Sequence, residues 1–243
     1  MAPPVLILGG SGGIGFALAK RMISQGRPIV IAARHGDRLN AAAQKLGGVP
    51  SFQCDTTDAA ALSEAVAKAA GTEGLSGVAY CVGSIVLKPL KRATVADFTE
   101  AFILNAVGAA VAVQAAEPAL RSARGSVILF STVAAQAGFP NHSVIAAAKG
   151  AVEALTRSLA ADLAPDVRVN CISPSLIRTP LAATLTANET VAKSIAALHP
   201  IPRLGEVDDI ASLAALLLSP ESGWITGQII GVDGGRSTVR TKG

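Results

Sequence analysis

Short apolar runs alternate with longer stretches of helical periodicity along almost the whole chain. The apolar runs, typical of buried strands, lie at residues 5–8, 28–33, 51–54, 77–82, 126–130, 168–172 and 228–232. Amphipathic patterns between them predict helices at 14–25, 37–46, 58–70, 95–120, 143–163 and 208–218. Strands that alternate with helices are typical of a parallel sheet with right-handed crossovers. We therefore expect an α/β fold with one doubly wound, parallel sheet of about seven strands, flanked by helices.

One segment interrupts this alternation. Residues 179–200 follow the sixth apolar run, and their pattern is helical with no further strand. Two interpretations stay open: a substrate-side lid and an ordinary pair of surface helices. Because no linker rich in proline or glycine divides the chain and no repeat is present, we expect residues 1–243 to form a single domain that includes this segment.

Glycines surround the junction between the first strand and the first helix. Gly9 would permit a tight turn, Gly13 would let a pyrophosphate approach the backbone, and Gly15 would let the helix pack closely on the strand. The helix N-terminus that follows attracts phosphate groups. This context predicts a Rossmann-type dinucleotide-binding turn, and the alternative is a glycine-rich turn without a ligand.

The end of the second strand bears on which dinucleotide is bound. An acidic residue there would accept hydrogen bonds from the ribose hydroxyls of NAD. Ala33 is neutral, and Arg34 follows it. A guanidinium suits the 2′-phosphate of NADP, so NADP(H) is favoured over NAD(H). Alternatively, Arg34 is a solvated surface charge.

Composition narrows the partners to small molecules. Hydrophobic residues make up 50% of the chain and charged residues 16%, and the net charge of +4 comes from scattered basic side chains, so we expect no nucleic-acid partner. Three cysteines without metal spacing indicate buried, reduced thiols and no metal site in a cytoplasmic protein. We find no signal peptide and no uninterrupted apolar run long enough to span a bilayer, so we expect no membrane partner.

Several motifs together resemble the short-chain dehydrogenases/reductases. The glycine turn has that family's G-x-x-x-G-x-G spacing, residues 168–175 resemble its Arg-Val-Asn…Pro-Gly segment, and residues 232–235 match its C-terminal Val-Asp-Gly-Gly motif. The resemblance covers nearly the whole chain. It implies a nicotinamide-dependent oxidoreductase that forms a homodimer or homotetramer.

The chain departs from the family pattern at three places outside the catalytic positions. Leu8 stands where the family usually has threonine, Ser175 replaces a glycine, and Tyr80-Cys81-Val82-Gly83 stands where the family has Asn-Asn-Ala-Gly. Tyr80, the only tyrosine, is interpreted as a packing residue of the core or beside the cofactor.

The resemblance also implies a set of cofactor-binding residues. Asp55 would contact the adenine, although the aspartate-rich segment could instead serve to cap the next helix through Thr57 or Asp58. The Ile177 backbone and the Thr179 hydroxyl would meet the carboxamide and the phosphates. The full implied set is Gly9, Ser11, Gly13, Ile14, Gly15, Arg34, Asp55, Thr56, Gly83, Lys149, Ile177 and Thr179.

The family's catalytic serine, tyrosine and lysine map onto Thr132, Ile145 and Lys149. Isoleucine has no proton to give, and acid–base catalysis by a positioned side chain is typically worth about 10²–10⁴-fold in rate. Asn105 matches an asparagine that holds a helix irregularity and a proton-relay water in the family. The alternative for Asn105 is a buried polar residue that satisfies backbone groups.

His142 is the candidate for a replacement proton donor. It lies seven residues before Lys149, so on a helix it would share the face of Lys149 and Ile145. The enoyl reductases of the wider superfamily place their tyrosine at this offset. The alternative is an exposed histidine near the helix start, where Asn141 and Ser143 would be the caps.

These observations leave two main hypotheses. The first is an NADP(H)-dependent reductase of a carbonyl or a conjugated enone or enoyl substrate, with atypical proton delivery. The second is a catalytically impaired NADP(H)-binding pseudoenzyme or partner subunit. A non-redox lyase or dehalogenase is disfavoured because the glycine turn is intact.

Overall fold

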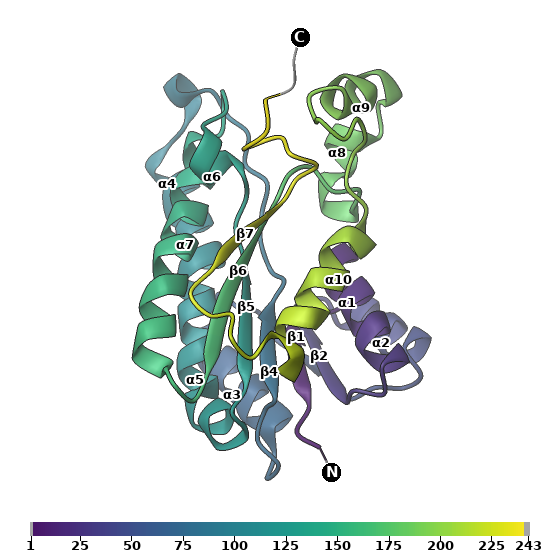
Figure 1. Ribbon diagram of the computed structural model, residues 1–243, viewed down its shortest axis with the longest axis vertical. Helices are drawn as coiled ribbons and strands as arrows, with labels where there is room; N and C mark the ends of the chain where they lie inside the picture. The colour runs from purple at the N-terminus through teal and green to yellow at the C-terminus, as the bar shows by residue number, and fades with distance from the viewer. Residues whose placement is uncertain (1, 241–243) are drawn as a thin grey trace.

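The computed structural model describes residues 2–240 as a seven-stranded parallel sheet between two layers of helices (Figure 1). The strands are β1 Val5–Leu8, β2 Ile29–Ala33, β3 Ser51–Gln53, β4 Gly77–Tyr80, β5 Ser126–Phe130, β6 Arg168–Pro174 and β7 Ile229–Val232. The expected parallel, doubly wound architecture is confirmed.

The strand order is β3-β2-β1-β4-β5-β6-β7, so the direction of winding reverses between β1 and β4. At such a reversal the two neighbouring crossover connections leave toward opposite faces of the sheet. A crevice therefore opens beyond the carboxyl ends of the strands, and open α/β sheets bind their ligands there.

The helices divide between two apolar cores, one on each face of the sheet. On one face lie α1 Gly13–Ser24, α2 Gly36–Lys45 and α10 Val207–Leu217. On the other lie α3 Ala59–Ala70, α5 Gly108–Ala123 and α7 Ser143–Leu163. Strands buried on both faces must be apolar throughout, which explains the uninterrupted Val5–Leu8 run.

The predicted helix over residues 95–120 is interrupted at its centre, where the resemblance implies a helix irregularity at Asn105. It consists of α4 Val95–Phe102, a π turn η2 Ile103–Val107, and α5, which continues to Ala123. In this turn the Asn105 amide donates to the Ala101 carbonyl at 2.8 Å, and the Tyr80 hydroxyl donates to the Leu104 carbonyl at 2.7 Å. A π turn inserts one residue into the helical ladder, and such turns are frequent at functional sites. Side-chain partners of this kind cannot be inferred from helical periodicity.

This helical stretch also corrects the expectation about membrane-length segments. Val95–Ala123 spans 29 residues with a mean hydropathy of 1.4 in its most apolar window, which is sufficient by length and composition to cross a membrane. The same properties are found in core helices, and 33% of that window is buried. Within the fold the stretch packs against α3 and α7.

Residues 179–200 are helical, as predicted. They form a 3₁₀ turn η3 Pro180–Ala182, then α8 Ala183–Thr186 and α9 Glu189–Ala196. In Figure 1 α8 and α9 lie beyond the carboxyl ends of the strands, and the short helix α6 Ala134–Ala137, which the sequence did not predict, lies on the opposite side. Two further 3₁₀ turns, η1 Leu90–Arg92 and η4 Pro220–Ser222, connect the larger elements.

Candidate functional site

The turn after β1 is tight and lets the helix pack closely on the strand, as its glycines predict. Gly9 has a φ of +82°, and a Cβ on it would lie 2.9 Å from the Cys81 carbonyl oxygen. A Cβ on Gly15 would stand 2.4 Å from the Gly9 carbonyl oxygen, so a side chain there would push α1 away from β1. These two positions therefore require glycine for backbone reasons alone.

The same turn presents an open backbone surface. Gly12, the N-cap of α1, provides no side-chain cap, so no side chain occupies the first amide groups of the helix. A Cβ on Gly13 would lie 2.9 Å from Thr179 Cγ2, which places the β6–η3 loop directly beside the turn. Ser11 lies in the turn itself, between Gly9 and Gly13 in the sequence. This combination of free amides and close glycine backbone fits the phosphates of a dinucleotide.

Arg34 and Asp55 lie at the neighbouring strand ends, outside the pocket described below. The Arg34 side chain is exposed, and Gln53 fixes its backbone by donating to the Arg34 carbonyl at 3.0 Å. Hydrogen bonds from the Thr57 amide and hydroxyl lower the pKa of Asp55, with a smaller contribution from Arg34. Asp58 caps α3 by accepting from two helix amides at 3.0 Å, so the capping alternative is confirmed for Asp58. Thr56, between these aspartates, is buried.

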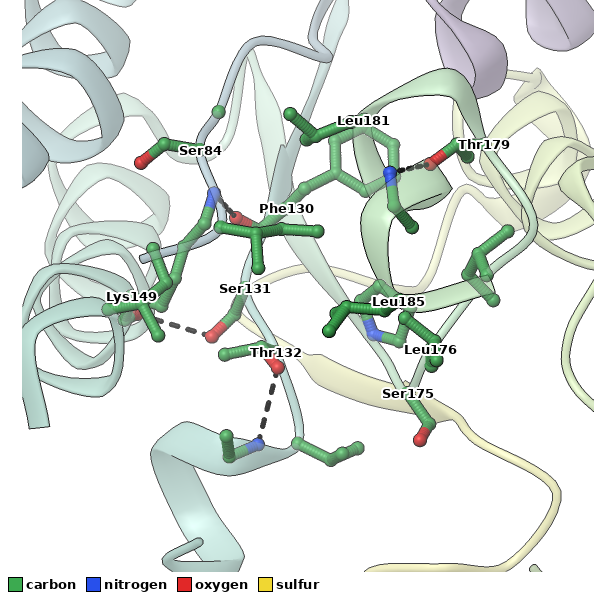
Figure 2. A pocket seen from close by; sticks show the side chains of 18 of the residues that line it. Ser84, Phe130, Ser131, Thr132, Lys149, Ser175, Leu176, Thr179, Leu181 and Leu185 are labelled. Atoms are coloured by element: carbon green, nitrogen blue, oxygen red, sulfur yellow. Dashed lines mark hydrogen bonds between the residues drawn. The ribbon is translucent and has the colours of Figure 1, made fainter. Parts of the chain in front are cut away.

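One pocket of about 270 Å³ opens over the carboxyl ends of β4, β5 and β6. Figure 2 shows it with Lys149 and Ser131 on one side and Thr179, Leu181 and Leu185 across from them. The predicted site residues that line it are Ile14, Gly83, Thr132, His142, Ile145, Lys149, Ile177 and Thr179. The fold thus brings together residues from five separate segments of the chain.

Lys149 lies at the buried end of this pocket. Its side chain is 7% exposed, and Nζ donates to the Phe130 carbonyl at 2.8 Å (Figure 2). Burial lowers the pKa of Lys149 to about 8. An ammonium has three donor hydrogens, so two of them remain for other partners.

Gly83 gives Lys149 access to Asn105. A Cβ on Gly83 would lie 3.0 Å from Asn105 Oδ1 and 3.2 Å from Lys149 Nζ, so any side chain there would fill the space between them. The Asn105 amide also donates to Ser84 Oγ at 3.1 Å, whereas its buried Oδ1 has no hydrogen-bond partner among residues 2–240. Asn105 therefore satisfies a backbone carbonyl of the π turn and still keeps one acceptor for a further group.

Thr132 and its neighbour Ser131 have different roles. Ser131 donates to Glu153 at 2.8 Å, and Gln136 donates to the same carboxylate oxygen at 3.1 Å, so this hydroxyl is committed to the protein. Thr132 Oγ1 only accepts from the Ala134 amide at 3.3 Å. Its hydroxyl hydrogen is thus available to a ligand, as Figure 2 indicates by the single contact drawn to α6.

His142 and Ile145 both line the pocket together with Lys149. His142 precedes the first residue of α7, and no side chain caps the helix there, so the expected caps from Asn141 and Ser143 are wrong. His142 Nδ1 donates to the Pro140 carbonyl at 2.7 Å, which leaves Nε2 for the pocket. Ile145 is 6% exposed and presents only hydrocarbon.

Besides Ser84 and Ser131, the structure adds Ser175, His199 and Arg236, which the sequence did not single out as site residues. Ser175 and Arg236 line the pocket, and His199 hydrogen-bonds to Ser175 from behind the pocket wall. Ser175 was visible in the sequence only as a departure from a glycine. Arg236 follows the C-terminal glycine pair directly, and this position was the signal that could have identified it.

The cysteines are all free, and Cys54 and Cys171 are buried as expected. Cys81 differs, because it is half-buried and lines the pocket. Burial raises the pKa of Cys81 to about 12, so its thiol is protonated and unreactive near neutral pH. No cluster of His, Cys, Asp or Glu suited to a metal ion occurs within residues 2–240.

Comparison with known proteins gives consistent matches over almost the full chain. A family model described as enoyl-(acyl carrier protein) reductase matches residues 9–237. The human dehydrogenase/reductase SDR family member 2, a mitochondrial protein, is 32% identical over 238 residues, which cover 94% of this chain and 84% of the human protein.

Solved structures are equally similar. A short-chain type dehydrogenase/reductase from Mycobacterium ulcerans has a TM-score of 0.91 at 31% identity, and the match covers 99% of this chain and 92% of that one. The protein ElxO, solved with NADP bound, has a TM-score of 0.89 at 25% identity, with 97% and 99% of the two chains covered.

Proposed function

The chain belongs to the short-chain dehydrogenase/reductase family, and on that premise we propose that it is an NADP(H)-dependent reductase of a carbonyl compound or a conjugated enone or enoyl substrate. One observation carries the proposal. Thr132, Lys149 and His142, each with a polar atom free for a ligand, line a single pocket that Ile14 and Thr179 connect to the glycine turn.

The residues present fit a nicotinamide dinucleotide. The turn from Gly9 to Gly15 and the uncapped start of α1 would hold its phosphates, with Thr179 beside them. The Lys149 ammonium would hold the nicotinamide ribose. When bound, this cofactor supplies hydride-transfer chemistry.

A preference for NADP(H) is supported by charge. Ala33 offers no carboxylate to a ribose diol, and the exposed Arg34 guanidinium suits a 2′-phosphate. The guanidinium also donates to His35 Nε2 at 3.4 Å, and its other N–H groups stay free for a phosphate. The NADP-bound ElxO structure is a relative that uses this form of the cofactor.

The protein's own residues would act on the substrate oxygen. The Thr132 hydroxyl would donate a hydrogen bond to it, and the Lys149 charge, held in a site of low polarity, would stabilise negative charge that develops there. Both groups are oriented before the ligand arrives, because backbone contacts fix them.

Proton delivery would come from His142 instead of residue 145. The Pro140 carbonyl holds Nδ1, which leaves Nε2 to carry and release a proton toward the pocket. Ile145 would exclude water from the same wall. The comparisons favour an enzyme over the pseudoenzyme alternative, since the matched proteins are named as dehydrogenases and reductases.

Calorimetric titration with NADPH, with NADH as the control, tests the cofactor part of the proposal. We expect NADPH to bind more tightly than NADH. Equal affinities for NADPH and NADH would show that Arg34 does not select the 2′-phosphate. If neither cofactor bound, the proposed oxidoreductase function would be contradicted.

Turnover of a panel of ketones and enones tests proton delivery. We expect His142→Ala to lower kcat by about 10²–10⁴-fold, the typical contribution of a positioned acid. Ser143→Ala, at the next and exposed position, is the matched control and should leave kcat unchanged. If His142→Ala turned over substrate as fast as the wild type, another group would deliver the proton.

We also propose that the chain forms a homodimer or homotetramer. Phe102, Ile103 and Val107 are 46%, 37% and 41% exposed on consecutive turns of α4 and η2. Ile103 and Val107 are four residues apart and so share one side of this helical stretch. We term the three residues the apolar strip, and exposed apolar side chains gathered in this way commonly mark protein interfaces.

A further inference from the structure

One wall of the pocket is cationic and aromatic, unlike the rest of its lining. Arg236, which follows β7, places its guanidinium carbon 4.4 Å from the centroid of the Phe139 ring. His142 meets the same ring edge-on, with the ring centroids 5.5 Å apart. Arg236, Phe139 and His142 therefore form one cluster on the pocket surface, which we term the cationic wall.

Arg236 has no counter-charge at ion-pair distance among residues 2–240. The nearest candidate, Asp233, uses its carboxylate to accept from the Gly235 amide at 2.9 Å and from the Ser237 amide at 2.8 Å. Burial alone would raise the pKa of Asp233, but the hydrogen bonds from Ser237 and Gly235 outweigh burial and lower it. The carboxylate is therefore already hydrogen-bonded within its own turn. A partly buried cation without a partner has lost part of its hydration, and an anionic ligand would compensate that loss.

Half-buried Ser175 and buried His199 together hold this guanidinium in place. Arg236 Nη1 donates to Ser175 Oγ at 3.3 Å, and Ser175 Oγ is 2.8 Å from His199 Nε2. His199 Nδ1 must be a donor, because its neighbours at 2.9 and 3.3 Å are the Ile195 and Ala196 carbonyls. In the neutral ring Nε2 then accepts the Ser175 proton, and the serine oxygen is left to accept from Arg236. In Figure 2 the Ser175 hydroxyl turns away from Lys149, as this role requires.

The position of Arg236 argues against a contact with the cofactor phosphates. The phosphate-binding turn follows β1, whereas Arg236 follows β7, four strands further along the sheet. Adjacent strands are about 4.8 Å apart, so the two strand ends are separated by roughly 19 Å. Between them the pocket is lined by aliphatic side chains such as Leu176, Leu181 and Leu185.

We propose that the cationic wall binds a carboxylate of the substrate, so that the substrates of this enzyme are oxo acids or unsaturated oxo acids with an aliphatic body. The reacting carbonyl lies at Thr132 and Lys149, the aliphatic body lies against the leucines, and the carboxylate meets the Arg236 guanidinium. A planar carboxylate matches the guanidinium in shape and charge. Ser175 and His199 are positioning residues for Arg236. The assignment of substrate class rests on the proposed reductase function, but the anion site itself does not require turnover.

Calorimetric titration with octanoate and with octanamide tests the anion site without any reaction. The two compounds have the same aliphatic chain and differ in charge. We expect the wild type to bind octanoate about 10- to 100-fold more tightly than octanamide, the range that a charge-assisted hydrogen bond supplies. Titrations with and without NADPH measure the affinity for both compounds in the free protein and in the presence of the cofactor.

Variants assign that preference to the cationic wall. Arg236→Leu should abolish it, Arg236→Lys should retain part of it, and Ser175→Ala should reduce it. Arg21→Leu, which removes an exposed charge near the end of α1, is the control for net charge and should change nothing. Equal binding of octanoate and octanamide, no measurable octanoate binding, or a preference that survives Arg236→Leu would each overturn the proposal.

Measurements of kcat/KM then test the proposed substrate class separately from the proposed reductase function. For a series from 4-oxopentanoate to 7-oxooctanoate and the matching methyl esters, we expect a higher kcat/KM for at least one acid than for its ester. We expect Arg236→Leu to remove that difference through KM. If the esters are reduced as well as the acids, the substrate class is wrong while the reductase stands. If no ketone, enone or oxo acid is reduced, the reductase function fails, and the octanoate titration still decides the anion site.

Discussion

The Tyr80 hydroxyl donates a hydrogen bond of 2.7 Å to the Leu104 carbonyl, and this contact ties the end of β4 to the π turn. The Tyr80 ring is 2% exposed, and burial raises the pKa of its hydroxyl to about 12, so it remains a donor throughout the physiological range. Asn105 is the next residue after Leu104. The tyrosine therefore helps to fix the backbone next to Asn105.

Replacing Tyr80 by Phe tests this support. The change removes the hydrogen bond from the buried Tyr80 ring to the Leu104 carbonyl, so we expect the free energy of unfolding to fall by about 0.5–1.5 kcal/mol in urea titrations. We also expect kcat to fall, because Asn105 loses its anchored neighbour. Full activity in a destabilised variant would show that the π turn keeps its geometry without the hydroxyl.

A second substitution gives a matched control for the Tyr80 variant. A Cβ on Gly108 would lie 2.2 Å from the Tyr80 hydroxyl, so Gly108→Ala should destabilise the wild type. In the Tyr80→Phe background that clash is removed, and the cost of Gly108→Ala should be smaller. Additive effects in the double variant would contradict the contact.

In the His142→Ala background, Ile145→Tyr should supply an acid in place of the lost imidazole. Ile145 is one turn before Lys149 on α7 and lines the same pocket, so a tyrosine there would direct its hydroxyl toward the substrate. We expect ketone reduction to rise by about 10²–10⁴-fold in kcat/KM. Ile145→Phe, which adds the ring without the hydroxyl, should show no gain. A gain in both variants would assign the effect to packing.

The burial of Lys149 makes stability depend on pH. Its pKa falls from the usual 10.5 to about 8 in the folded protein, because burial disfavours the charged form. Below pH 8 the charge is present in both states and its burial opposes folding. Between pH 8 and 10.5 only the unfolded chain still holds the proton, so this unfavourable contribution shrinks as pH rises.

Lys149→Met should therefore be more stable than the wild type at pH 7, by up to about 3 kcal/mol at roughly 1.4 kcal/mol for each pKa unit. The difference should decline between pH 8 and 10.5, as urea titrations at several pH values will measure. A difference that is constant with pH would show that the lysine is charged throughout. In the wild type, NADPH affinity should weaken above pH 8, and in Lys149→Met that trend should be absent.

Arg34→Leu should weaken NADPH binding by about 10- to 100-fold and leave NADH binding unchanged, because only NADPH carries the 2′-phosphate. Arg38→Leu, two residues into α2, is the control for a nearby lost charge. Ala33→Asp should favour NADH by supplying the acceptor for the ribose hydroxyls. Calorimetric titration of each variant with both cofactors measures these affinities. If Arg34→Leu weakened NADPH and NADH binding equally, the Arg34 charge would act on both cofactors and would not recognise the 2′-phosphate.

Ile103→Glu should disrupt the proposed oligomer. The side chain is 37% exposed within the apolar strip, so a carboxylate there would remain solvated in a monomer and be buried in an assembly. Light scattering after size-exclusion chromatography should show a smaller species than the wild type. Val239→Glu, exposed outside the strip, should leave the mass unchanged. A wild type that is already monomeric would contradict the assembly.

The sequence by itself determined the sheet, the glycine turn and the placement of Lys149 in the pocket. These features are local: an apolar run as short as Val5–Leu8 is typical of a buried strand between two helical layers, and Gly9 has a positive φ within its own turn. Lys149 follows from helix spacing and a recognisable motif. Patterns of this kind involve residues that are close together in the sequence, so they can be interpreted before the fold is known.

Only the tertiary structure decided how the cationic wall and the π turn are built. Ser175 and His199 are 24 residues apart in the sequence, and Ser175 and Arg236 are 61 apart. They meet because β6 and β7 are neighbours whose carboxyl ends reach the same edge of the sheet. The Tyr80–Leu104 contact likewise joins a strand end to a helix across 24 residues. Periodicity reports which face of an element is buried, whereas the partner that a polar side chain finds there depends on strand order and packing.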